Sequence, residues 1–189
     1  MKNIVIFGAP GSGKGTQSDK IIAEFGVEHI STGDVLRAEI KAGTELGKTA
    51  SAYINEGKLV PDSLIVDMLA STLDSKGKDI KGVIFDGFPR TIAQAEALDA
   101  MLKERGQEVN VVIGLEVDDA ELIKRIIARG QTSGRADDNE ETAKKRLDTY
   151  YSQTLPLKDF YINQGKYAKI NGVGSIDDIY AEISAAIKK

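Results

Sequence analysis

Five short hydrophobic segments predict the strands of a sheet. Residues 83–86 and 111–117 are unalternated apolar runs, which are typical of strands buried on both faces. Further apolar segments that favour strands occupy residues 3–7, 27–30 and 167–170. Parallel strands covered on both sides fit this pattern.

Segments in which hydrophobic residues have helical spacing separate these strands. Ile21, Ile22 and Phe25 lie on one side of a helix over residues 13–25, and Ser31 is a good N-cap residue for the next helix. The other predicted helices cover residues 35–40, 46–56, 61–73 and 175–187, and one helix follows each of the strands at 83–86 and 111–117. This alternation predicts an α/β fold, a doubly wound five-stranded parallel sheet with helices on both faces.

The composition is that of an ordinary globular protein with one well-cored domain. The chain has 189 residues, 41% of them hydrophobic, and its net charge of −4 argues against general binding to nucleic acid or anionic membranes. It has no cysteine, which excludes disulfides and thiolate zinc sites. No stretch approaches the roughly 20 apolar residues of a membrane span, and Gly8 and Pro10 follow the start too soon for a signal peptide, so we expect a cytoplasmic protein.

The segment G-A-P-G-S-G-K-G-T at residues 8–16 lies between a predicted strand and a predicted helix, the context that a phosphate-binding loop requires. Glycines let backbone amides turn around an anion, and Lys14 can bridge the β and γ phosphates. The strict pattern places Ser or Thr directly after the lysine, whereas here Gly15 intervenes. A plain glycine turn would need neither the lysine nor these flanking elements. We therefore predict that ATP binds at Gly11, Ser12, Gly13, Lys14, Gly15 and Thr16.

Further motifs follow along the chain. They are S-T-G-D-V-L-R at 31–37, G-K-L-V at 57–60, D-G-F-P-R-T at 86–91, R-G-Q-T-S-G-R-A-D-D at 129–138 and I-N-G-V-G-S at 170–175. Together with the G-K-G-T form of the loop, they make residues 4–187 resemble the adenylate kinase family. The resemblance implies reversible transfer of a phosphoryl group from Mg-ATP to AMP, giving two ADP.

The resemblance also implies which residues act on the donor nucleotide and on the transferred group. Arg125, Arg129 and Gly174 would join the loop in binding ATP. Positioned cations stabilise the charge of phosphoryl transfer, and no covalent nucleophile is needed. The residues implied to be catalytic are Lys14, Arg90, Arg125, Arg129, Arg135 and Arg146.

The acceptor site follows from the same resemblance, with Thr32 near the adenine as the best marker of specificity for AMP. Asp86 would hold Mg²⁺, through water, and no structural zinc is expected. Residues implied to bind AMP are Thr32, Arg37, Lys58, Leu59, Val60, Gly87, Phe88, Pro89, Arg90, Gln94, Arg135 and Arg146.

By resemblance, two small units are inserted into the core, which comprises residues 1–30, 61–129 and 139–189. Residues 31–60 form a helical AMP-binding domain, and residues 130–138 form a short lid in which Asp137 and Asp138 assist closure by pairing with arginines. The family also implies a monomer. We assign His29, the single histidine, a structural role because transfer between nucleotides needs no imidazole base.

Three other functions remain to be distinguished. A UMP/CMP kinase would share nearly every phosphate contact, but Thr32 and the short lid argue against it. A GTPase-like switch would use the loop without a second nucleotide site, and its guanine motif N-K-x-D is absent. A nucleic-acid-binding module is poorly supported by the acidic balance and the low aromatic content of 6%.

Overall fold

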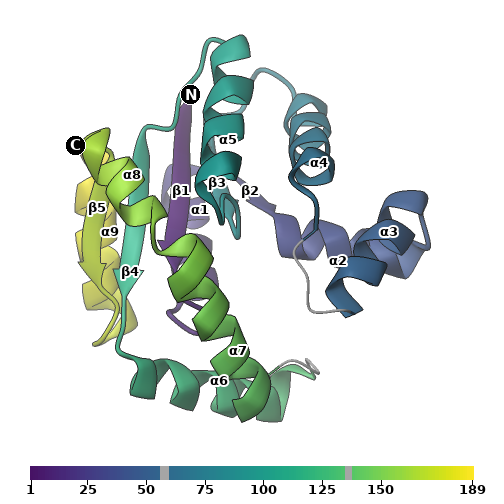
Figure 1. Ribbon diagram of the computed structural model, residues 1–189. Helices are drawn as coiled ribbons and strands as arrows, with labels where there is room; N and C mark the ends of the chain where they lie inside the picture. The colour runs from purple at the N-terminus through teal and green to yellow at the C-terminus, as the bar shows by residue number, and fades with distance from the viewer. Residues whose placement is uncertain (56–59, 135–137) are drawn as a thin grey trace.

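The computed structural model describes residues 1–55, 60–134 and 138–189, and it confirms the predicted sheet. Within these residues, five parallel strands lie in the order β2-β3-β1-β4-β5 (Figure 1). The strands are β1 Lys2–Gly8, β2 Glu28–Ser31, β3 Gly82–Asp86, β4 Val111–Glu116 and β5 Tyr167–Asn171.

The register of the sheet brings the functional segments to one edge. In the central strand, Ile6 pairs with Asp86 of β3 and with Ile113 of β4. The carboxyl ends of β1 and β3 therefore lie side by side. The phosphate loop follows β1 and the D-G-F-P-R-T segment follows β3, so both emerge at the edge where α/β sheets bind ligands.

Helices cover both faces of the sheet, as predicted (Figure 1). They are α1 Lys14–Phe25, α2 Thr32–Ala42, α3 Glu45–Asn55, α4 Asp62–Ser75, α5 Ile92–Glu104, α6 Asp119–Ser133, α7 Glu140–Thr149, α8 Leu157–Asn163 and α9 Ile176–Lys188, with a π-helix at Tyr150–Thr154. Among the described residues, no helix combines the length and the apolar character needed to cross a membrane.

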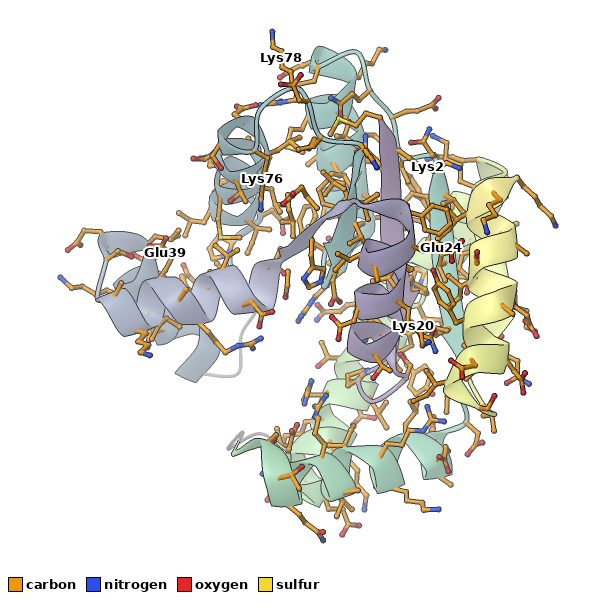
Figure 2. The ribbon with its side chains drawn as sticks, turned by 180° about the vertical axis from the view of Figure 1, so that it is seen from behind. Lys2, Lys20, Glu24, Glu39, Lys76 and Lys78 are labelled. Atoms are coloured by element: carbon orange, nitrogen blue, oxygen red, sulfur yellow. The ribbon has the colours of Figure 1, made fainter. Side chains whose placement is uncertain are left out.

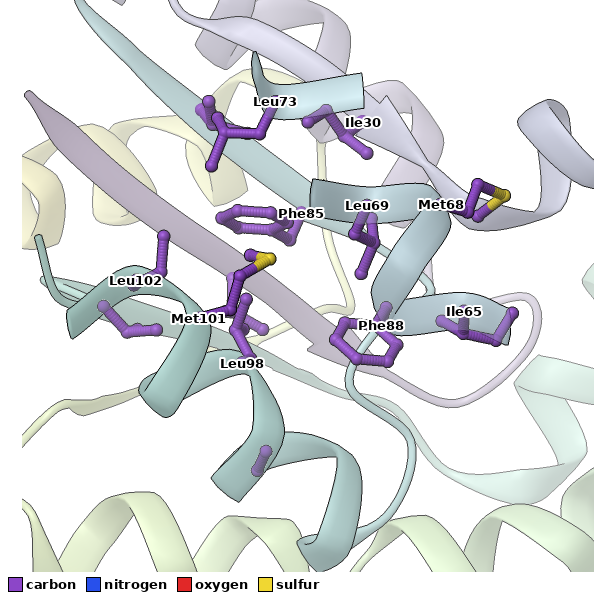
Figure 3. Close-up of a cluster of buried hydrophobic side chains, with 14 of the residues drawn as sticks. Ile30, Ile65, Met68, Leu69, Leu73, Phe85, Phe88, Leu98, Met101 and Leu102 are labelled. Atoms are coloured by element: carbon purple, nitrogen blue, oxygen red, sulfur yellow. The ribbon is translucent and has the colours of Figure 1, made fainter. Parts of the chain in front are cut away.

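Alternate residues of the three central strands, β3, β1 and β4, enter two different cores. Val5 of β1 and Phe85 of β3 face α4, α5 and α8, where Leu69 and Leu98 are fully buried against them (Figure 3). Ile4 and Ile84 face the other way and pack with residues of α1 and α9. Burial on both faces explains why these strands read as continuous hydrophobic runs.

The last helix is fastened to the first strand and the first helix on the face seen in Figure 2. The Glu24 carboxylate of α1 accepts hydrogen bonds from Tyr180 Oη at 2.6 Å and Ser184 Oγ at 3.0 Å, and pairs with Lys188 Nζ at 2.5 Å. Lys2 Nζ donates to the carbonyl of Ile187. Tyr180, Ser184 and Lys188 all belong to α9, so this helix is docked along its length.

Two helix boundaries differ from the sequence prediction. Pro61 is the N-cap of α4 and lies just outside its first turn. Helix α6 continues past Arg129 to Ser133 and ends at Gly134, whose φ of 65° is left-handed. Gly130 lies inside this helix where the backbone of Asp138 approaches closely: a Cβ at Gly130 would lie 2.1 Å from the Asp138 carbonyl oxygen, so there is no room for a side chain. The predicted lid segment 130–138 thus begins within a helix.

Candidate functional site

The phosphate loop joins β1 to α1 through two left-handed glycines, Gly11 with φ 83° and Gly13 with φ 96°. Gly13 is also the N-cap of α1, and no side chain caps this end of the helix. The first amides of α1 are therefore available to an anion, and the helix dipole favours negative charge there. This is the geometry that the glycine pattern predicts.

Lys14 folds back into this loop. Its Nζ donates to the carbonyls of Gly8 at 2.9 Å and Ala9 at 3.0 Å. Burial of the ammonium lowers the pKa of Lys14 to about 8; the Asp86 carboxylate acts in the opposite direction, and three guanidiniums, those of Arg90, Arg146 and Arg129, lower it further. The charges of one carboxylate and three predicted phosphate-binding arginines therefore act on this lysine.

Asp138 holds two of these arginines. Its buried carboxylate accepts from Arg129 Nε at 2.7 Å and from a second Arg129 nitrogen at 2.6 Å. Arg146 donates to it at 3.3 Å and Ser133 Oγ at 2.9 Å. Hydrogen bonding from Arg129, above all, depresses the Asp138 pKa to about 2. The carboxylate therefore fixes Arg129 at the end of α6 relative to Arg146 on α7.

Asp86 ends β3 and lies beside His29 of β2. His29 Nε2 is 3.3 Å from Asp86 Oδ2, and this hydrogen bond raises the pKa of the imidazole. Among the described residues, Asp86 Oδ1 carries no hydrogen bond. A half-buried carboxylate with one oxygen open, next to a phosphate loop, suits Mg²⁺, which typically binds through one or two carboxylates together with substrate phosphates.

A cavity of about 280 Å³ adjoins the phosphate loop at Ser12 and Gly13. Arg125 forms part of its wall, held by Glu121 at 2.9 Å and by the Gly172 carbonyl at 3.1 Å. Gly174 and Gln17 also line the cavity, and the Gln17 amide donates to the Ile176 carbonyl at 3.2 Å. Arg125 and Gly174, predicted from distant motifs, therefore meet at one cavity.

Two predicted acceptor residues, Thr32 and Arg90, meet at the carbonyl of Gly87, directly after Asp86. Thr32 Oγ1 donates to the Gly87 carbonyl at 3.1 Å, and Arg90 Nε donates to the same carbonyl at 2.8 Å. Arg90 is exposed, yet the protein around its guanidinium displaces water and thereby lowers its pKa. The positive charge of Arg146 lowers this pKa further, and that of Arg37 does so more weakly. Arg37 itself pairs with Asp34.

Other predicted acceptor residues are buried in the structure, which the motifs did not predict. Val60 and Phe88 are buried in the core against α4 and α5, and Pro89 is also buried. Gln94 is buried at 3% exposure. Lys58, Leu59 and Arg135, which were predicted site residues, lie outside the described residues.

Sequence reasoning missed Asp62 and Gln17 and named Asp138 only as an aid to closure. Asp62 accepts from the Gln94 amide at 2.8 Å, yet in the sequence it is simply an acidic residue at a helix start. Gln17 lies one helical turn after Lys14 in α1, and this spacing was a sequence signal that Gln17 is close to the phosphate loop. Nothing in the spacing of Asp138 distinguishes it from its neighbour Asp137.

Comparison with known proteins agrees with this geometry. The sequence profile of the family described as adenylate kinase matches residues 6–166. The chain belongs to the adenylate kinase family. Curated adenylate kinases of Phocaeicola vulgatus and Bacteroides thetaiotaomicron are 69% and 66% identical to it, each aligned over the full length of both chains. The adenylate kinase of Porphyromonas gingivalis is 53% identical over all of this chain and 97% of its own length.

Membership of the adenylate kinase family confirms the resemblance predicted from the motifs. The match spans the phosphate loop, the acceptor motifs and the arginine-rich helices. The sister-family, switch and nucleic-acid interpretations each lack this support.

Proposed function

We propose that this chain transfers a phosphoryl group reversibly from Mg-ATP to AMP, forming two ADP. The observation that carries the proposal is a phosphate loop whose Lys14 lies at the carboxyl edge of β1, beside the end of β3 at Asp86 and within reach of the charges of Arg90, Arg129 and Arg146. Phosphoryl transfer spreads negative charge over the attacking, leaving and equatorial oxygens, and preorganised cations stabilise that charge. The names of the similar proteins support the same reaction.

On the donor side, we assign the ATP phosphates to the amides of residues 11–16 and to Lys14. The adenine of ATP then occupies the cavity beside Arg125 and Gly174. Arg129 reaches the ATP phosphates from the end of α6. When a polyphosphate enters the loop, Lys14 exchanges its two carbonyl partners for phosphate oxygens, which are stronger acceptors.

On the acceptor side, Thr32 and Gln94 face the adenine of AMP, and Arg37, Arg90 and Arg146 bind its phosphate. Arginine suits this task because its planar fork of donors matches the phosphate oxygens. The remaining contacts in the proposal are Lys58, Leu59, Val60, Gly87, Phe88, Pro89 and Arg135.

Magnesium belongs with the donor nucleotide in this proposal, and Asp86 would hold it through water. When bound, the ion neutralises charge on the phosphates. Asp86 also offsets the mutual repulsion of Lys14 and the arginines, so the carboxylate serves the site before any ligand binds.

We retain the division into a core of residues 1–30, 61–129 and 139–189, an AMP-binding domain at 31–60 and a lid at 130–138. Helices α2 and α3 extend away from the sheet, and α6 and α7 extend from its carboxyl edge (Figure 1). Closure of these parts over two nucleotides would exclude water and prevent ATP hydrolysis. A cytoplasmic monomer stays our expectation.

The first test measures ADP formation from Mg-ATP offered separately with AMP, UMP, CMP and GMP, with ATP alone as control. Strong turnover with AMP supports the proposal. Preference for UMP or CMP would assign the chain to the sister activity, and hydrolysis without any acceptor would indicate a switch.

Single variants test the assignment of the cations. Lys14→Ala and Arg90→Ala should each reduce kcat/KM by roughly a hundredfold or more, because each removes a positioned charge from the transition state. Lys124→Ala, on the exposed face of α6, and Lys103→Ala, exposed in the last turn of α5, are matched controls. Near-normal turnover of the site variants with intact folds would contradict the assignment.

A further inference from the structure

The side-chain amide of Gln94 is held from two sides by groups of opposite hydrogen-bonding character. Its Oε1 accepts from the backbone N–H of Arg90 at 2.7 Å, and its Nε2 donates to Asp62 Oδ1 at 2.8 Å. Gln94 lies in the first turn of α5, and Asp62 is the first residue of α4. Two helices with separate starting points thus meet at one amide.

These two partners determine which end of the amide is oxygen and which is nitrogen. A carboxylate only accepts hydrogen bonds, and a backbone N–H only donates them. Turning the amide over would place its oxygen against the Asp62 carboxylate and its NH₂ against the Arg90 N–H. Both hydrogen bonds would be replaced by like-signed contacts, so one orientation is strongly favoured.

The amide nevertheless keeps unused hydrogen-bonding capacity. A glutamine side chain has two N–H donors and two oxygen lone pairs. Among residues 1–55, 60–134 and 138–189, one donor and one lone pair are engaged. One N–H and one lone pair, in a fixed order, remain for a ligand. Adenine matches that order with its N1 acceptor and 6-amino donor, whereas hypoxanthine presents the reverse, an N1–H donor and a 6-oxo acceptor.

The location of the amide suits this use. Arg90, whose backbone holds the oxygen of Gln94, donates its Nε to the Gly87 carbonyl, and Thr32 donates to the same oxygen. Asp62 comes two residues after Val60. The anchored amide therefore borders the proposed acceptor pocket.

We propose that Asp62 is a positioning residue that sets the base selectivity of the acceptor site by locking the Gln94 amide in the orientation that reads adenine. This inference rests on the proposed function, since it takes AMP to be the acceptor. A capping role alone for Gln94, which accepts from a backbone N–H beside the Thr91 N-cap, would affect stability and leave base selectivity unchanged.

The test compares kcat/KM for AMP with kcat/KM for inosine monophosphate, which differs from AMP at the two base positions that matter. Asp62→Asn should lower the AMP to IMP ratio by about tenfold, because an asparagine amide can present either a donor or an acceptor to Gln94. The KM for Mg-ATP should not change. Asp67→Asn, at an exposed position of the same helix, is the matched control and should keep the wild-type ratio.

A double-mutant cycle shows whether Asp62 acts through Gln94. In a Gln94→Ala background, Asp62→Asn should have no further effect on the ratio. An unchanged ratio in Asp62→Asn, or an equal fall in both backgrounds, would overturn this inference and leave transfer to AMP standing. Failure of the wild-type protein to phosphorylate AMP would overturn the proposed function as well.

Discussion

Replacing Asp138 by asparagine should destabilise the fold by an amount that depends on pH. The buried carboxylate accepts hydrogen bonds from Arg129, Ser133 and Arg146. Asparagine keeps nearly the same shape, but it removes the negative charge that pairs with Arg129 and Arg146. Its amide nitrogen also cannot accept a hydrogen bond, so one of the two accepting oxygens is lost together with the charge.

The size of the effect follows from the pKa. A shift from 3.8 to about 2 is worth about 2.4 kcal/mol, since one pKa unit corresponds to about 1.36 kcal/mol. The Arg129 and Arg146 side chains are 37% and 30% exposed, so water recovers part of the loss and about 2 kcal/mol remains. For a chain of this length, that loss lowers Tm by roughly 4–8 °C near pH 7.

Because the pKa is depressed in the folded state, the stabilisation is present above the unfolded value of 3.8 and disappears as pH falls toward 2. Near pH 3, about half of it should remain. Urea unfolding of wild type and Asp138→Asn at both pH values measures this change, with Asp148→Asn on the exposed face of α7 as control. Equal losses at both pH values, or a loss no greater than that of the control, would refute the reasoning.

Three further predictions concern single positions. Thr32→Ala should weaken discrimination for AMP over UMP and CMP by about tenfold in kcat/KM ratios, and unchanged ratios would remove Thr32 from base recognition. Gly130→Ala should cost about 2 kcal/mol or more in thermal melts, because the added Cβ would lie 2.1 Å from the Asp138 carbonyl oxygen; a wild-type Tm would mean that this backbone yields freely. The kcat/KM for Mg-ATP should decline above about pH 8 as Lys14 loses its proton. In Lys14→Arg the side chain stays charged, so the activity that this variant retains should not decline there. The same decline in both proteins would assign it to another group.

The strands were predictable because their environment is simple. Residues 83–86 are buried on both faces, so every position is hydrophobic until Asp86 emerges at the carboxyl edge. Motifs immediately after such strands then indicate the location of the site without any knowledge of tertiary contacts.

The end of α6 was not predictable in the same way. Gly130 is predicted to begin the lid, but it lies inside α6, at a point where the absence of a side chain admits the backbone of Asp138. The π-helix at Tyr150–Thr154 was likewise not predicted, and Tyr150 there packs against Phe7 with ring centroids 5.7 Å apart. The Gly130 contact depends on how the chain returns between α6 and α7, and the Tyr150 contact joins segments distant in the sequence.

In the site, motifs indicated which cations are present but not what holds them. Lys14 follows from its pattern, whereas its carbonyl partners at Gly8 and Ala9 follow from the fold of the loop. The Asp62 contact with Gln94 joins residues 32 positions apart, and no local pattern encodes that distance.

The docking of α9 on α1 has a consequence for how the chain acquires its structure. The apolar side of α1, with Ile21 fully buried, is covered by Ile179 and Ile183 of α9, at nearly opposite ends of the sequence. Bringing two such distant segments together costs loop-closure entropy and slows folding, and the apolar surface that is exposed until then is prone to aggregation. During synthesis, the apolar side of α1 therefore stays exposed until α9, 160 positions later in the sequence, has been made, and nucleotide-binding competence should appear only after that.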